Sequence, residues 1–192
     1  MRSVCFATSN PEKLYVAQTV CKSAGIVLER ARLDIDEIQA EDPVLIVQDK
    51  SRRAYAQLGK PVVVSDDSWD IPALNGFPGP YMKSINHWFK PEDLLRLMHG
   101  VKDRTIILCQ YLAYTDGKMV KVVTNRIMGQ ITLEARGRND RSPSMSVIVL
   151  DLDGDRTLAE VFASNATDLD ARYWQYPDVW HGFVEWYKKA SH

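Results

Sequence analysis

Two adjacent carboxylates, Asp66 and Asp67, stand just after the apolar run Val62–Val64. Three β-branched residues in a row are typical of a buried strand, so this run predicts a strand that ends at Ser65. Neighbouring carboxylates repel each other and resist removal from water, and a divalent cation or a transferred proton between them relieves that cost. The pair therefore predicts a metal or acid–base site at the end of a strand.

A loop with a fixed backbone follows the acidic pair. The segment Asn75–Tyr81 reads NGFPGPY, in which the prolines fix the backbone and the glycines free it, and Lys83 comes soon after. A buried strand, two carboxylates, a shaped loop and a lysine together predict a magnesium and phosphate site.

A second phosphate contact is predicted near the N-terminus. Val4–Ala7 has the composition of a strand, and Pro11 suits the first position of a helix. The unpaired N–H groups and the dipole at a helix start attract anions, so Thr8, Asn10 and Lys13 can contact a phosphate group there. The same residues also fit an ordinary strand-to-helix turn with a good cap.

The elements that must position these residues alternate between strand and helix. The acidic run Asp34–Asp42 is typical of a solvated loop, although one of its carboxylates can reach a metal. Apolar residues at helical spacing near the C-terminus, from Val179 to Tyr187, predict a core or dimer-forming helix face. The other predicted elements are strands at 26–33, 105–114, 118–127, 129–133 and 147–152, helices at 43–58, 91–100 and 178–189, and a hairpin turn at 115–117.

Length and composition bound the class of protein. The 192 residues, 45% of them hydrophobic, fit one domain, and a net charge of −1 gives no overall footprint for nucleic acid or a membrane surface. Cys5, Cys21 and Cys109 lie among apolar neighbours and predict reduced, buried thiols in a cytosolic protein. The cysteines and histidines show no metal-ligand spacing, so carboxylates binding Mg²⁺ or Mn²⁺ are favoured.

The two predicted phosphate motifs occur together in one known family. TSNPEK at 8–13, followed by SDDSWDIPALNGFPGPY at 65–81, resembles the Ham1-like inosine triphosphate pyrophosphatases, and the resemblance continues to Arg136-Gly137. It implies an α/β fold, a long twisted mixed β-sheet with flanking helices and two lobes around a central cleft, formed by residues 1–192 as a single domain. It also implies a cytoplasmic homodimer that hydrolyses a nucleoside triphosphate to the monophosphate and pyrophosphate.

The resemblance assigns roles to individual residues. The implied metal ligands are Glu41, Asp66 and Asp67, with Asp67 also activating the attacking water. The implied catalytic residues are Asp67, Lys50 and Lys13, and the implied substrate contacts are Thr8, Asn10, Lys13, Lys50, Ser68, Lys83 and Arg172. Trp69 departs from the family pattern and is a candidate substrate contact by its position alone. In this arrangement Mg²⁺ and the lysines stabilise the charge that develops on the phosphates.

The part of the family pattern that reads the base is altered. Ser144–Ile148 stands where the family has Phe-Gly-Trp-Asp-Pro, and of the later Lys and Ser-His-Arg only Arg172 remains. Loss of groups that pair with a polar edge removes discrimination, so the resemblance implies a preferred base other than inosine. Trp69, or the aromatic group of Tyr173, Trp174 and Tyr176, is a candidate replacement for the stacking ring.

Two readings from other classes compete with an enzyme. One is a catalytically weak nucleotide-binding or regulatory protein that keeps the fold, and the other is an interaction protein that uses the aromatic C-terminal helix. Paired carboxylates beside the phosphates favour the enzyme, because a binder that does no chemistry has no need of them.

Overall fold

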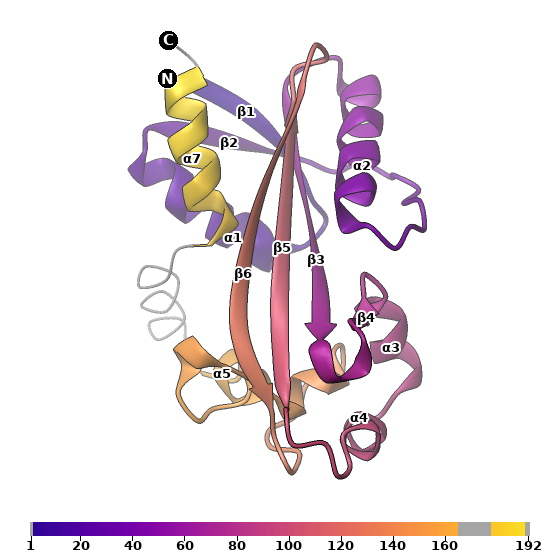
Figure 1. Ribbon diagram of the computed structural model, residues 1–192. Coiled ribbons are helices and arrows are strands. Elements are labelled where there is room, and N and C mark those ends of the chain that lie inside the picture. Colours follow the sequence, from indigo (N-terminus) through magenta and orange to yellow (C-terminus); the bar gives the residue numbers. More distant parts are fainter. Residues whose placement is uncertain (1, 165–177, 191–192) are drawn as a thin grey trace. The chain divides into compact units, whose positions relative to one another are not determined.

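The first strand begins a β–α–β unit in the computed structural model, which describes residues 2–164 and 178–190 (Figure 1). Strand β1 (Arg2–Ala7) leads into helix α1 (Pro11–Ser23) and then into strand β2 (Ile26–Ala31). β1 and β2 are parallel and in register over their whole length. The turn at the end of β1 therefore lies at the edge where α1 begins.

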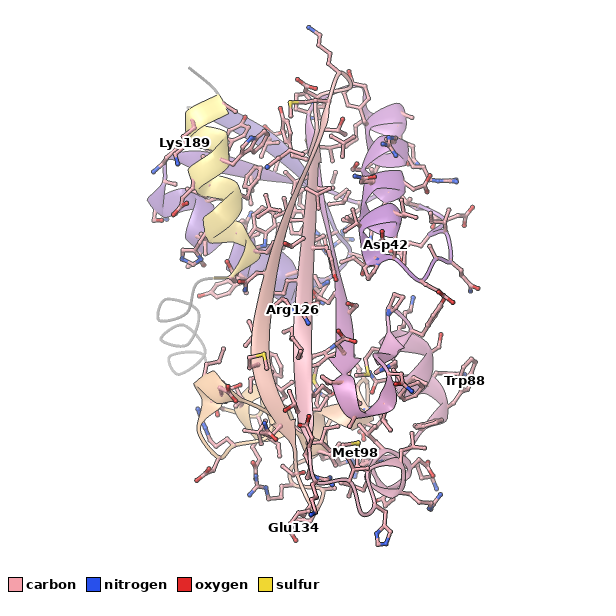
Figure 2. The ribbon with its side chains drawn as sticks, in the orientation of Figure 1. Asp42, Trp88, Met98, Arg126, Glu134 and Lys189 are labelled. Atoms are coloured by element: carbon pink, nitrogen blue, oxygen red, sulfur yellow. The ribbon has the colours of Figure 1, made fainter. Side chains whose placement is uncertain are left out.

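Helix α2 (Pro43–Leu58) has the bounds that the sequence predicts. Asp42, labelled in Figure 2, accepts a hydrogen bond from the Val44 N–H at 2.9 Å and so caps the helix start. Gly59 ends the helix with a φ of 64°, a left-handed conformation that glycine adopts without strain. These signals are local, which explains why the sequence predicts this helix correctly.

Strand β3 (Val62–Ile71) pairs in parallel with β1 and is longer than predicted. The prediction that it ends at Ser65 is wrong, because the acidic pair lies inside the strand. Strand β5 (Thr105–Thr115) lies beside β3 in the sheet, and strand β4 (Phe77–Gly79) pairs antiparallel with the last three residues of β3, so β3 has pairing partners beyond Ser65. Polar residues disfavour strands only weakly, so a pairing partner outweighs their propensity.

A hairpin and several short elements complete the described chain. The predicted turn joins β5 to β6 (Val120–Ile131), and β6 runs through Gly129–Ile131, so the strands predicted at 118–127 and 129–133 belong to one strand. No turn residue separates them. The remaining helices and strands are α3 (Met82–Trp88), α4 (Pro91–Leu97), β7 (Ile148–Leu150), α5 (Leu158–Phe162), α7 (Val179–Ala190) and three short 3₁₀ segments.

The expected α/β fold with a mixed sheet is confirmed. Within the described residues the strand order is β2-β1-β3-β5-β6-β7, and β4 pairs with β3 beside this path. Parallel pairs at β1 combine with antiparallel pairs at β4 and at β7. None of the helices that the structure describes is both long and apolar enough to cross a bilayer.

The chain divides into two compact units, which are described separately. Unit 1 comprises residues 1–67, 110–125 and 177–192, and unit 2 comprises residues 68–109 and 126–176. In unit 1, α1 and α7 cover one face of the parallel strands and α2 covers the other (Figure 1).

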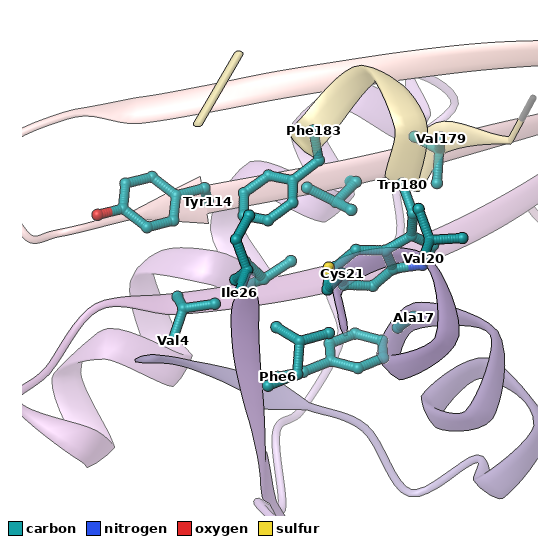
Figure 3. Close-up of a cluster of buried hydrophobic side chains, with 13 residues drawn as sticks. Val4, Phe6, Ala17, Val20, Cys21, Ile26, Tyr114, Val179, Trp180 and Phe183 are labelled. Atoms are coloured by element: carbon teal, nitrogen blue, oxygen red, sulfur yellow. The ribbon is translucent and has the colours of Figure 1, made fainter. Parts of the chain in front are cut away.

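The aromatic stripe of α7 belongs to the core of unit 1. Trp180 and Phe183 are buried with Phe6 of β1 and Tyr114 of β5 (Figure 3). The rings of Phe6 and Trp180 meet edge to face at a centroid distance of 4.7 Å. Of the two readings that the sequence leaves open for this stripe, the structure supports the core.

The cysteines are buried, and unit 2 has a hydrophobic core of its own. Cys5, Cys21 and Cys109 are buried and form no disulfide within the described residues, as the sequence predicts, and burial raises the pKa of Cys21 to about 12. In unit 2, Leu94 and Met98 pack into a core that extends to β7. α4 ends earlier than its predicted limit of residue 100.

Candidate active site in unit 1

The turn between β1 and α1 is held in shape by its own side chains. The Asn10 N–H donates to the Thr8 hydroxyl oxygen at 3.1 Å, and the Lys13 N–H donates to the Asn10 side-chain oxygen at 3.2 Å. Asn10 therefore caps α1 in the way that its sequence position predicts. The turn places Thr8 and Lys13 at the positive end of the helix dipole, where an anion is stabilised.

Arg30 of β2 braces this turn from the neighbouring strand. Its guanidinium donates to the carbonyl oxygens of Thr8 at 3.2 Å and of Ser9 at 2.8 Å. With both carbonyls engaged, the turn is fixed from outside as well as from within. The sequence gives no local signal for this contact, because Arg30 is 21 residues from Ser9 along the chain.

Consecutive side chains of β3 point to opposite faces of the sheet, and this separates the acidic pair. Val62 and Val64 pack in a cluster with Val47 of α2, whereas Val63 packs in the cluster that includes α1. The same alternation directs Asp66 to the α2 face and Asp67 to the α1 face. The two carboxylates therefore do not lie side by side, as they would at the mouth of a strand.

Asp67 pairs with Lys13 on the α1 face. The Lys13 Nζ lies 2.8 Å from the Asp67 Oδ2, and the two side chains are 31% and 34% exposed. Burial lowers the pKa of Lys13, but the charge and hydrogen bond of Asp67 outweigh burial, so the pKa is raised overall. Lys13 is therefore held as a cation at the start of α1.

Lys50 pairs with Glu37 on the α2 face. The Lys50 ammonium forms an ion pair with the Glu37 carboxylate and also donates to the Ser65 carbonyl at 3.3 Å. Glu41, the carboxylate that the resemblance assigned to the metal, is exposed and makes no side-chain hydrogen bond or ion pair within the described part of the chain. Both acids belong to one acidic loop, so position in the sequence alone does not distinguish them.

Asp66 lies in the middle of this charged group. Burial raises the pKa of Asp66, and the charges of Lys50 and Lys13 act in the opposite direction. Glu37 and Asp67 add to the rise, since like charges disfavour ionisation. Three carboxylates and two ammonium groups of unit 1 thus influence one another around the end of β1 and the middle of β3.

The carboxylates fit a hard divalent cation. Among the described residues, no cluster of three or more acidic, histidine or cysteine side chains is arranged as a ready metal cage. Mg²⁺ does not need such a cage, because proteins hold it through one or two carboxylates together with the phosphates of a substrate. Asp66 and Glu37, which share the α2 face with Lys50, supply that number.

The remaining candidate residues belong to unit 2 or lie outside the described chain. Ser68 is buried, Lys83 is exposed on α3, and Trp69 is 9% exposed within the core of unit 2. An indole packed in a core offers little free ring face for stacking. Arg172 and the aromatic group at 173–176 lie outside the described residues, and the roles of Ser68 and Lys83 stay predictions.

The altered base-reading motif, Ser144–Ile148, lies mostly in a partly buried 3₁₀ segment of unit 2, Pro143–Val147. Ser144 and Ser146 are buried, and the Ser144 N–H donates to the Asn86 side-chain oxygen of α3 at 3.1 Å. Asp70 of β3 forms an ion pair with Arg126 (Figure 2) at 3.5 Å in the same unit. No aromatic side chain takes the place of the family's stacking ring within residues 143–147.

Comparison with known proteins identifies relatives over most of the chain. The model of the Ham1 family matches residues 4–173. A dITP/XTP pyrophosphatase of Methanopyrus kandleri is 31% identical over 186 residues, which is 96% of each chain. A dITP/XTP pyrophosphatase of Saccharolobus solfataricus is 32% identical over 130 residues, which is 68% of each chain.

Solved structures share the fold at lower identity. A HAM1 protein from Coxiella burnetii has a TM-score of 0.77 at 20% identity, and the alignment covers 98% of this chain and 100% of that protein. The Staphylococcus aureus Ham1 protein has a TM-score of 0.74 at 17% identity, with both chains covered completely.

Proposed function

Since this chain belongs to the Ham1 family, we propose that it is an enzyme that hydrolyses a nucleoside triphosphate to the monophosphate and pyrophosphate. The observation that supports this most is the meeting, within unit 1, of a capped helix start, two lysines and three carboxylates. Its relatives from M. kandleri and S. solfataricus are named as dITP/XTP pyrophosphatases.

The phosphates are proposed to bind at the β1–α1 turn. The Thr8 hydroxyl, the Asn10 amide and the Lys13 ammonium surround the N-terminus of α1, and Lys50 faces the same charged group from α2. Such preorganised donors stabilise the charge that develops on phosphate oxygens as the anhydride breaks. Arg30 contributes indirectly, by holding the carbonyls of the turn away from the anion.

The divalent cation is proposed to be held by Glu37 and Asp66. A bound Mg²⁺ or Mn²⁺ would neutralise phosphate charge and polarise the phosphoryl oxygens. Glu37 replaces Glu41 in this assignment because its carboxylate reaches Lys50 and influences Asp66. Asp67 is not assigned to the cation in this proposal, because its carboxylate pairs with the Lys13 ammonium at 2.8 Å.

Asp66 is proposed to accept the proton of the attacking water. The water oxygen forms a bond to the α-phosphorus, the bond from that phosphorus to the bridging oxygen breaks, and pyrophosphate leaves with the electron pair. A carboxylate within reach of the attacking water can act as its general base. The place of Asp66 beside Lys50 and Glu37 puts it next to the proposed phosphate and metal contacts.

We propose that the preferred base differs from inosine. The altered segment Ser144–Ile148 has buried serines at 144 and 146, where the family pattern has an aromatic ring and a carboxylate. The homodimer and the cytoplasmic location remain predictions from the resemblance, and light scattering of the purified protein measures the oligomeric state.

The test is pyrophosphate release, measured with Mg²⁺ over a panel of canonical, deaminated and otherwise modified nucleoside triphosphates. Turnover of at least one nucleotide supports the proposal, and the order of kcat/KM values gives the preferred base. Tight binding of a nucleotide without any turnover would instead support the nucleotide-binding or regulatory protein. Asp66→Asn should lower kcat by about 10²- to 10⁴-fold, the usual contribution of a general base.

A further inference from the structure

A pocket of about 410 Å³ lies within unit 1, between α2 and the turn of the β5–β6 hairpin (Figure 1). Sites that bind small molecules have volumes of roughly 300–1,000 Å³, so this pocket is large enough for one. Gln48, Arg52 and Tyr55 line it from α2, and Lys118 and Met119 line it from the hairpin. None of the described residues that line it is acidic.

The pocket is separate from the proposed phosphate site. The buried stripe of α2, which includes Val47 and Ala54, faces the sheet. Because a helix turns by about 100° per residue, Arg52 and Tyr55 project from one side of that stripe and Lys50 projects from the other. Lys50 is the α2 residue that reaches the proposed phosphate site. A ligand in the pocket therefore occupies the opposite flank of the helix.

The two basic side chains of the pocket are available to a ligand. Arg52 and Lys118 are exposed, and neither forms an ion pair or a side-chain hydrogen bond with another described residue. Arg53, the next residue of α2, by contrast pairs with Asp49 at 2.6 Å. A guanidinium and an ammonium group in one concave site attract an anion, and a phosphate group suits both of them.

The charged groups near the pocket leave it positive. Asp116 is the acidic residue of the turn, and its side chain accepts the Lys118 N–H at 2.9 Å. Lys121 lies on the other face of β6, because side chains alternate along a strand and Val120 packs on the α2 face. Arg52 and Lys118 against Asp116 give a net charge of +1, whereas the whole chain has −1.

Tyr55 is held against the hairpin by the glycine of the turn. Gly117 has a φ of 87°, which glycine adopts without strain, and a Cβ at this position would overlap the Tyr55 ring. The ring is half-buried, and its hydroxyl makes no hydrogen bond to another residue of the described chain. Met119 beside it is 44% exposed. The pocket therefore combines a fixed aromatic ring and an apolar side chain with two cations.

We propose that this pocket is a second binding site, which takes a nucleoside monophosphate. Arg52 and Lys118 bind the single phosphate group, and the base lies against the Tyr55 ring. Gln48 lines the same pocket, and its amide both donates and accepts, as the polar edge of a base requires. This site goes beyond the proposed hydrolase and does not depend on it.

The experiment is a titration of the ¹⁵N-labelled full chain with adenosine 5′-monophosphate, followed by NMR at low salt in EDTA. The amide signals of Gly117 and Lys118 report on the pocket, and those of Thr8 and Lys13 report on the proposed phosphate site. Adenosine 5′-monophosphate should shift the Gly117 and Lys118 signals with one common Kd. No shift of these two signals at millimolar ligand overturns the proposal.

Inorganic phosphate is the second probe, because it has the charge without the base. It should shift the same two signals with an affinity about tenfold or more below that of adenosine 5′-monophosphate, since stacking of a base on an aromatic ring is worth at least that factor. Equal affinities would mean that the Tyr55 ring adds nothing and that an inorganic anion is the ligand, which overturns the proposal.

Arg52→Gln should weaken the binding of adenosine 5′-monophosphate at Gly117 and Lys118 by about tenfold or more. Its effect on the Thr8 and Lys13 signals should be absent. Arg53→Gln is the matched control, because it removes the same charge one residue away from a side chain that pairs with Asp49. This control should change the affinity by less than about threefold. Equal weakening in both variants would indicate general attraction of an anion, and would overturn the proposal.

Tyr55→Leu tests the stacking by a difference between the two probes. It should weaken adenosine 5′-monophosphate about tenfold and leave inorganic phosphate within about twofold. An equal loss for both probes would mean that Tyr55 only holds the hairpin in place, and would overturn the proposal. If this variant does not fold, Lys118→Gln replaces it, since Lys118 is exposed, and it should weaken both probes about tenfold. Unchanged affinities in Lys118→Gln also overturn the proposal.

Failure of this inference is distinguishable from failure of the proposed function. Release of pyrophosphate from nucleotides, without a shift at Gly117 and Lys118, rejects the second site alone. A shift at these residues in a protein that turns over no nucleotide rejects the hydrolase alone.

Discussion

At the residue scale, the site is defined by which face of β3 each carboxylate occupies. Adjacent residues in a strand point in opposite directions, so Asp66 and Asp67 work with different helices despite being neighbours in sequence. Asp67 meets Lys13 of α1, whereas Asp66 shares the α2 face with Lys50 and Glu37. Their charged partners therefore differ, although the side chains are identical.

The choice of Glu37 over Glu41 leads to a direct prediction. Glu37→Gln should raise the Mg²⁺ concentration that gives half-maximal pyrophosphate release by about tenfold or more, since even an outer group of a metal site contributes that much. Glu41→Gln is the matched control, because Glu41 is exposed in the same loop and forms no side-chain ion pair with another described residue. Its Mg²⁺ requirement should equal that of the wild type, and the reverse order would return the metal to Glu41.

At the element scale, local signals predict α2 and the β5–β6 turn, while long-range pairing decides β3. α2 begins at Pro43 after the capping residue Asp42 and ends before Gly59, so residues next to the helix determine its limits. β3 continues past Ser65 because it has pairing partners there: β5, which comes much later in the sequence, lies beside it, and β4 pairs with its last three residues. The pattern of apolar residues in a strand does not show which strand pairs with it, and so does not show how far the strand extends.

Some residues of the candidate site could likewise be predicted from local sequence signals, and others could not. Thr8, Asn10 and Lys13 follow from the cap at the start of α1, which the sequence predicts. Glu37 and Arg30 act through contacts that a loop or a neighbouring strand creates, and no motif marks either residue. Residues in a turn next to their own helix are therefore predictable, and residues that reach the turn from elsewhere are found only in the fold.

Arg30 gives a prediction about the turn as a unit. Arg30→Gln removes the charged donors to the Thr8 and Ser9 carbonyls, so the turn should lose its fixed shape. We expect KM for the preferred nucleotide to rise about tenfold with a smaller change in kcat, since part of the roughly 1.5–3 kcal/mol of a charged hydrogen bond is then required to order the turn.

Arg32→Gln is the control for that change. Arg32 follows β2 directly, is exposed and makes no side-chain hydrogen bond or ion pair with another described residue. It loses the same charge without touching the turn. An equal rise of KM in both variants would show that long-range attraction of the nucleotide, and not the brace, accounts for the effect.

At the scale of the whole molecule, unit 1 is assembled from three separate stretches of sequence. Its last stretch, α7, buries Val179, Trp180 and Phe183 against β1 and α1. The β1–α1 turn therefore rests on a core that the C-terminal helix completes (Figure 3). Changes at the start of α7 should alter the stability of the unit that carries the proposed phosphate site.

Asp178, at the start of α7, should make the stability of unit 1 depend on pH. Its carboxylate accepts from the Trp180 N–H at 2.9 Å and lies 3.0 Å from the His181 ring, yet burial raises its pKa overall, despite these partners. A raised pKa means that the folded state binds the proton more tightly than the unfolded chain does. The stabilisation is complete below the unfolded value of about 3.9 and is lost as pH rises through the folded pKa.

Asp178→Asn keeps an acceptor for the helix cap and cannot ionise. Its stability relative to the wild type should therefore increase as pH rises from about 3 to 7, measured as the free energy of unfolding in urea. Asp116→Asn is the control of opposite sign, because the Lys118 and Met119 N–H groups lower the pKa of Asp116 in the β5–β6 turn. This second variant should lose stability relative to the wild type over the same rise. A flat or falling difference for Asp178→Asn would mean that the cap and His181 stabilise the charged carboxylate more than burial opposes it, and that α7 begins on a favourable charge.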